Sequence, residues 1–136
     1  MEDRTAPGTA ALIQRARPIG PSDRILDLGT GAVGRVLRER LGAAASITTL
    51  EAGPASALPF GDGSFELILC QHLGQPDPGL VAQLGQVRRA LTPGGRFIGS
   101  TSQDGETVRA ALLETGFTDV SIERSGTTTV LHARRP

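Results

Sequence analysis

The most constraining feature of this chain is an acid and a set of glycines that separate a predicted strand from a predicted helix. Residues 24–28 form a short apolar run interrupted by one acid, Asp27. Three glycines follow directly: Gly29, Gly31 and Gly34. From Val33 to Leu41 the apolar residues recur at helical spacing, with arginines mostly off that stripe. A strand that enters a glycine turn and then a helix is the building unit of parallel α/β sheets.

The rest of the chain continues this alternation of strands and helices. Further strands are predicted at residues 46–50, 65–70 and 96–100, and helices at 78–91 and 108–115. Two β-rich stretches, 118–124 and 127–132, close the chain without a helix between them and predict an antiparallel edge. The fold class predicted is α/β, with a doubly wound, mostly parallel sheet of about six strands and an antiparallel C-terminal strand pair.

Length and composition narrow the classes of protein further. The chain of 136 residues predicts one domain at 23–136, preceded by a polar segment at 1–22 with a short helix. Fourteen basic and fourteen acidic residues cancel, which argues against nucleic acid or an anionic membrane as partner. A single cysteine, Cys70, excludes an internal disulfide framework and a cysteine-built metal site. No metal-ligand spacing is present, and a cytoplasmic protein is the default expectation.

The glycine turn predicts where a ligand would bind. In an open α/β sheet, ligands bind beyond the C-terminal ends of the strands, where glycines allow close approach of the backbone and a helix N-terminus offers free N–H groups. A second acid, Glu51, follows the next predicted strand, where it can accept hydrogen bonds from ribose hydroxyls. Asp27 ends a buried strand, so its carboxylate needs a partner. That partner is either a cationic ligand or the backbone N–H groups of the following turn, and in the second case Asp27 only caps the turn.

Three motifs together carry a resemblance to a known family. The first turn has the pattern Asp-x-Gly-x-Gly, with an acid after the second strand. Residues 57–72 contain Leu-Pro-Phe and lead into a strand, and residues 87–97 contain Pro-Gly-Gly and lead into another. Gly-Phe at 116–117 precedes the final two strands. In this order the motifs resemble class I S-adenosylmethionine-dependent methyltransferases, over roughly residues 22–136, which implies a Rossmann-like fold.

The resemblance assigns the cofactor to the first two strand ends. Asp27, Gly29 and Gly31 would line its methionine end, and Glu51 would hold its ribose. A sulfonium and an ammonium would supply the positive partner that Asp27 needs.

Four more residues receive roles from the same resemblance. Ala55 and Leu58 match the segment that packs on the adenine. Cys70 would lie beside the methionine moiety as a packed thiol rather than a nucleophile. His72 follows the same strand and is the candidate general base, the alternative being a loop histidine bonded to backbone.

The sequence also departs from the family pattern. Only Ala52–Ala57 separate the second-strand acid from the Leu-Pro-Phe segment, too few residues for the helix and strand that the family has there. One β-α unit is therefore predicted to be deleted. Gly53-Pro54 stands where the family has Gly-Asp, so the acid that would bind the adenine amine is missing. A homodimer or heteromer would complete the resulting open site.

Three functions remain open at this stage. The first is S-adenosylmethionine-dependent methyl transfer to a small molecule or a protein side chain. The alternative is a non-catalytic methyltransferase-like module that binds or stabilises a partner protein, for which the N-terminal domain of the anamorsin family is a precedent. The third, a nicotinamide-dinucleotide binder, is favoured only by the bare spacing Gly-x-Gly-x-x-Gly.

Overall fold

The computed structural model describes residues 23–28, 32–42, 46–50, 60–70, 78–101, 105–125 and 128–136. The elements in chain order are β1 (Arg24–Leu28), α2 (Ala32–Leu41), β2 (Ser46–Leu50), β3 (Phe65–Cys70), α3 (Pro78–Ala90), β4 (Leu91–Thr101), α4 (Gly105–Thr115), β5 (Thr118–Ser125) and β6 (Thr128–Arg134). The N-terminal segment 1–22, with its predicted helix, lies outside the described residues. No helix in the described ranges is long and apolar enough to cross a membrane.

The strands form one mixed sheet, which confirms the predicted fold class. Within the described residues its order is β2-β1-β3-β4-β6-β5. Strands β2, β1, β3 and β4 are parallel, whereas β6 is antiparallel to both β4 and β5. From β1 the chain passes outward to β2 and then returns to β3 on the other side of β1. The direction of winding therefore reverses between β1 and β3, which is the place where doubly wound sheets bind ligands.

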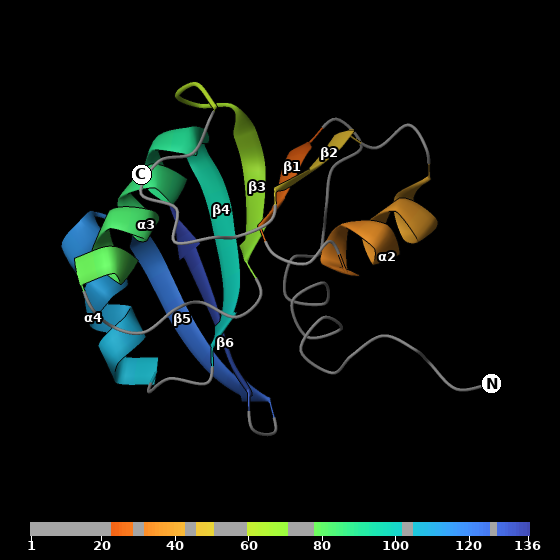
Figure 1. The fold of residues 1–136 in the computed structure, drawn as a ribbon. Coiled ribbons are helices and arrows are strands. Elements are labelled where there is room, and N and C mark those ends of the chain that lie inside the picture. Colours follow the sequence, from red (N-terminus) through yellow and green to blue (C-terminus); the bar gives the residue numbers. More distant parts are fainter. Residues whose placement is uncertain are drawn as a thin grey trace.

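Helices cover both faces of the sheet, as Figure 1 shows, with α3 and α4 on one side and α2 on the other. Leu84 of α3 and Leu112 of α4 are fully buried in one apolar cluster with Phe97 of β4. Leu37 of α2 is buried in the second cluster, with Ile25 among its partners. Alternate residues of each strand point to opposite faces, so the apolar residues of β1 and β3, interrupted by Asp27 and Glu66, supply both clusters.

Strand β4 begins earlier than the sequence predicts, because the Pro-Gly-Gly turn is paired rather than loose. Leu91 is fully buried and lies in register with Phe65, with a register shift before the next pair. Gly94 N donates to Arg135 O at 2.8 Å, and Arg135 N donates to Gly95 O at 2.9 Å. The turn that ends α3 is thus joined by backbone hydrogen bonds to the residues after β6.

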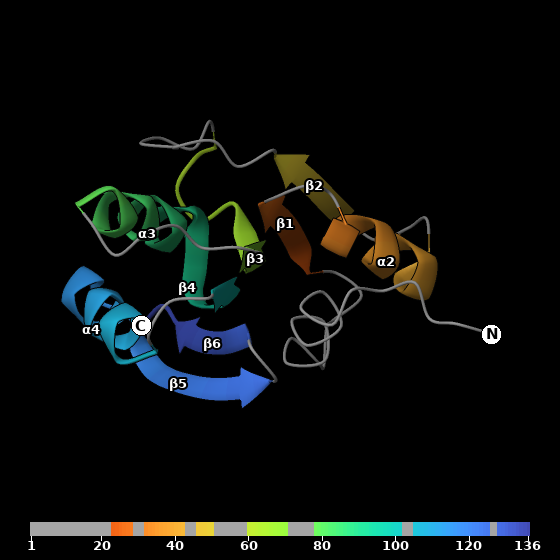
Figure 2. The ribbon, with the colours of Figure 1, turned by 60° about the horizontal axis from the view of Figure 1, so that its bottom comes forward.

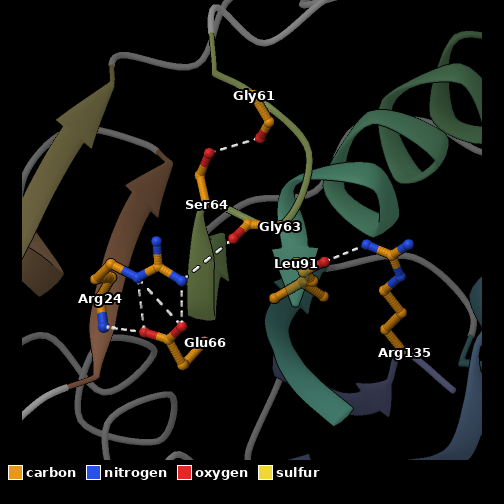
Figure 3. A network of polar contacts seen from close by, with 7 residues as sticks. All are labelled: Arg24, Gly61, Gly63, Ser64, Glu66, Leu91 and Arg135. Atoms are coloured by element: carbon orange, nitrogen blue, oxygen red, sulfur yellow. Dashed lines mark hydrogen bonds and ion pairs between the residues drawn. The ribbon is translucent and has the colours of Figure 1, made fainter. Parts of the chain in front are cut away.

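The end of the sheet at which β1 and β3 begin is held by arginines (Figure 3). The Arg24 side chain donates to both Glu66 carboxylate oxygens, and its Nη2 also donates to Gly63 O at 3.2 Å. Arg135 Nη1 donates to Leu91 O and to Arg89 O. These contacts tie strand starts and a helix end together at the end of the sheet away from the glycine turn.

The shortened connection between β2 and β3 is consistent with the predicted deletion. The described residues contain no strand between these two, and β2 forms one edge of the described sheet. Residues 51–59 lie outside the described residues. The turn at 60–64 brings the chain into β3, with Ser64 Oγ donating to Gly61 O at 2.6 Å.

Candidate functional site

The candidate site lies where β1 and β3 end, at the point where the winding reverses. Leu28, the last residue of β1, is in register with Leu50 of β2 and with Cys70 of β3. Three strands therefore end at the same level, and the glycine turn, Glu51 and His72 follow those ends in the sequence. This agrees with the placement expected for a ligand site in an open α/β sheet.

Asp27 is the charged residue that the fold places at this level. Its side chain is buried, with an exposed fraction of 1%. Its two neighbours in β1 are apolar, and it lies one residue from the strand end. The carboxylate Oδ2 accepts a hydrogen bond from the backbone N–H of Gly34 at 2.9 Å. Gly34 is the third residue of α2, so this N–H is one of the four that a helix leaves unpaired at its N-terminus. The cap that the sequence offered as one reading of Asp27 is therefore present.

Burial is the main influence on the ionisation of Asp27. It raises the pKa of the carboxyl above the ordinary value, while the Gly34 hydrogen bond and the charge of Arg38 lower it to a smaller extent. The folded protein thus disfavours the ionised form of Asp27. A neutral asparagine at this position could also accept the hydrogen bond from Gly34. A charge held at such a cost is typical of functional sites, where a ligand of opposite charge offsets it.

Gly34 is needed for the helix to approach this carboxylate. A Cβ atom at this position would lie 3.0 Å from Asp27 Oδ2 and 3.0 Å from Thr49 Oγ1, and 3.4 Å from Ile47 Cγ2. Its lack of a side chain lets the first turn of α2 pack directly on β1 and β2. The third glycine of the motif therefore serves close packing of helix against strand, one of the roles that glycines have in such turns.

Cys70 ends β3 in register with Leu28, and its thiol is buried in the apolar cluster on the α3 and α4 side of the sheet, with an exposed fraction of 1%. Burial and, to a smaller extent, the charge of Asp27 raise the pKa of Cys70 to about 12. A thiol in this state stays protonated at neutral pH and is a poor nucleophile. This agrees with the role of a packed side chain.

Six predicted site residues fall outside the described residues, so their roles stay predictions: Gly29, Gly31, Glu51, Ala55, Leu58 and His72. Of the predicted set, Asp27 and Cys70 lie among the described residues; they stand near the ends of the neighbouring strands β1 and β3, with their side chains on opposite faces of the sheet. Within the described ranges no group of three or more histidine, cysteine, aspartate or glutamate side chains could hold a metal ion.

Sequence reasoning missed Arg38, whose charge acts on Asp27. Arg38 lies four residues after Gly34, so helical spacing places both on one side of α2. Its Nη2 donates to Ile47 O of β2 at 2.9 Å. That spacing was the available signal, but which face of the helix meets the sheet edge is set by tertiary packing.

Comparisons with known proteins give the fold but no family assignment. No family model matches the sequence, and no curated protein matches it. The structure resembles a chain in the complex between the Haloferax volcanii Trm112 methyltransferase activator and a methyltransferase, with a TM-score of 0.76, 17% identity, and coverage of 100% of this chain and 92% of that one.

Two further solved structures give the same result. An S-adenosylmethionine-dependent methyltransferase of Thermotoga maritima has a TM-score of 0.73 at 14% identity, covering 98% of this chain and 91% of that one. Phosphoethanolamine N-methyltransferase 2 of Haemonchus contortus, solved with S-adenosylmethionine, has a TM-score of 0.77 at 15% identity, and this chain spans 52% of it. The chain therefore has the fold of class I S-adenosylmethionine-dependent methyltransferases.

Proposed function

We propose that this protein binds S-adenosylmethionine at the ends of β1 and β3 and transfers its methyl group to a small molecule or a protein side chain. The observation that carries the proposal is the buried carboxylate of Asp27, held by Gly34 at the point where the winding of the sheet reverses. Solved structures of the same fold contain S-adenosylmethionine or S-adenosylhomocysteine. The chemistry that this cofactor supplies is a methyl group activated by a sulfonium, and the protein contributes binding and orientation.

The residues of this chain suit a cationic ligand. Asp27 offers a carboxylate whose remaining negative charge would attract the ammonium and the sulfonium of the methionine end. Cys70 would fill the floor of the site as a neutral thiol, since its pKa lies far above neutrality. Gly29 and Gly31 would let the backbone approach, and Glu51 would bind the ribose.

The remaining predicted residues complete the proposed site. Ala55 and Leu58 would pack on the adenine, and His72 would accept the proton of a hydroxyl or amine acceptor. A partner chain, either a second copy or another protein, would cover the site that the shortened β2–β3 connection leaves open. One solved protein of this fold forms a complex with an activator protein.

A ligand panel tests the proposal. Thermal unfolding is measured over a concentration series of S-adenosylmethionine, S-adenosylhomocysteine or NAD. A ligand at about one hundred times its Kd adds ~2.7 kcal/mol to the free energy of unfolding. For a domain of this size that corresponds to a rise in Tm of roughly 10 °C. We expect this rise with the first two ligands.

The other outcomes distinguish the alternatives. A response to NAD alone would favour a dinucleotide binder. No response to any of the three ligands would contradict the proposal and leave the non-catalytic, partner-binding module as the better account. His72→Ala separates binding from catalysis, because it should keep the rise in Tm and slow transfer to a hydroxyl or amine acceptor by ~10²-fold or more.

A further inference from the structure

The two edges of the sheet are protected very differently. Strand edges carry unpaired N–H and C=O groups that can pair with another chain, and proteins block them with charges, bulges or irregular backbone. The β5 edge has all three: its register shifts between Thr118 and Ser121, Asp119 has a φ of 51°, and Glu123 and Arg124 are exposed. Figure 2 shows β5 and β2 at opposite ends of the sheet.

The β2 edge has none of these features in its own sequence. Its five residues, Ser46–Leu50, contain no charge and no proline, and every one is in regular register with β1. The side chains of Ser46, Thr48 and Thr49 are exposed. Among the described residues β2 pairs with β1 alone. β-Branched residues fill three of the five positions, so the strand is well suited to pairing.

The charge beside this edge comes from helix α2, which packs against β2. Its sequence holds Arg35, Arg38 and Arg40 against a single acid, Glu39. Arg35 and Arg38 are exposed, and Arg38 Nη2 donates to the backbone oxygen of Ile47 within β2. An uncharged strand edge is therefore flanked by a basic helix, in a chain whose net charge is zero.

We propose that the β2 edge is a docking site for an extended, acidic segment of another protein, which adds to the sheet as a further strand. Backbone hydrogen bonds would supply the binding, and carboxylates of the segment would face the arginines of α2. A carboxylate that engages Arg38 would draw the guanidinium away from Ile47 O and free that carbonyl for pairing. Pairing of two copies through β2 is disfavoured, because it would bring two basic α2 helices toward each other. This docking does not depend on methyl transfer.

Two labelled peptides test the proposal. Both alternate threonine and valine; one has glutamates at both ends and its twin has lysines. Binding to the full chain is followed by fluorescence anisotropy, and the bound region is located by hydrogen exchange. We expect saturable binding of the acidic peptide, weaker binding of the lysine peptide, and new exchange protection at residues 46–50. Arg35→Glu, an exposed change on α2, should weaken binding of the acidic peptide about fivefold.

Arg109→Glu is the matched control, since Arg109 is exposed on α4, on the other side of the sheet. It should leave the affinity within about twofold of the original. Equal affinity for the two peptides, no saturable binding, or protection confined to β5 would overturn the proposal. So would sedimentation showing a dimer whose formation protects residues 46–50, which would make a second copy the occupant.

Discussion

Replacing Gly34 with alanine tests how closely helix α2 packs on the candidate site. The new Cβ would lie 3.0 Å from both Asp27 Oδ2 and Thr49 Oγ1, tighter than an ordinary carbon–oxygen contact. Overpacking of a filled site costs ~1–3 kcal/mol, and the better helix propensity of alanine returns up to ~1 kcal/mol. We therefore expect a net loss of about 1–2 kcal/mol in the free energy of unfolding, which lowers Tm by about 4–8 °C.

Gly85 provides the matched control within helix α3. A Cβ there meets nothing within 4 Å, so alanine gains helix propensity without a clash. Gly85→Ala should stabilise the protein by ~0.5–1 kcal/mol. Urea unfolding of both variants, followed by circular dichroism, measures the difference. If Gly34→Ala stabilised the protein as much as Gly85→Ala does, the close contact of α2 with Asp27 would be wrong.

Three further outcomes follow from described contacts. Burial raises the pKa of Asp27, so the protonated side chain stabilises the folded protein most at pH values below the ordinary aspartate pKa. This stabilisation is lost as pH rises through the raised pKa. Asp27→Asn should therefore gain stability relative to the original protein as pH rises from about 4 to 7. Urea unfolding of both proteins at a series of pH values in that range measures the difference in free energy of unfolding, and a difference that does not change with pH would contradict this expectation. Cys70, with a pKa of about 12, should not react with an aromatic disulfide reagent at pH 8 until urea unfolds the protein, and fast labelling of the native state would refute its burial. Arg135→Ala removes side-chain hydrogen bonds to Arg89 O and Leu91 O and should lower the free energy of unfolding by about 1–2 kcal/mol. The control Arg134→Ala, at an exposed position, should change it by less than ~0.5 kcal/mol. Equal effects of the two substitutions would show that the Arg135 side chain does not hold the turn.

The strands and helices of the sheet could be predicted because their signals are local. The apolar run at 24–28, the Asp-Pro start of α3 and the glycine after α4 each mark an element that the structure has. The start of β4 at Leu91 could not be predicted, because it depends on pairing with Phe65 and with the residues after β6. Such contacts join residues far apart in the sequence.

The type of candidate site and its place in the fold could be predicted from the sequence, but the contacts between its residues could not. The position of Asp27 at a strand end follows from the pattern of the sequence. Its hydrogen bond to Gly34 and the influence of Arg38 depend on how α2 lies across β1 and β2. No local pattern specifies that angle, so the sequence leaves open whether Asp27 caps a helix, awaits a ligand, or does both.

The most direct test of the proposed function is the affinity for S-adenosylmethionine of the original protein and of Asp27→Asn, measured by titration calorimetry. Asparagine keeps an oxygen that can accept the Gly34 hydrogen bond but removes the negative charge. If the carboxylate binds a cation, Asp27→Asn should raise the Kd for S-adenosylmethionine roughly thirtyfold or more, the equivalent of ~2 kcal/mol in binding free energy. The fold should stay intact. An unchanged Kd in the variant would show that Asp27 only caps α2 and would contradict its role in cofactor binding.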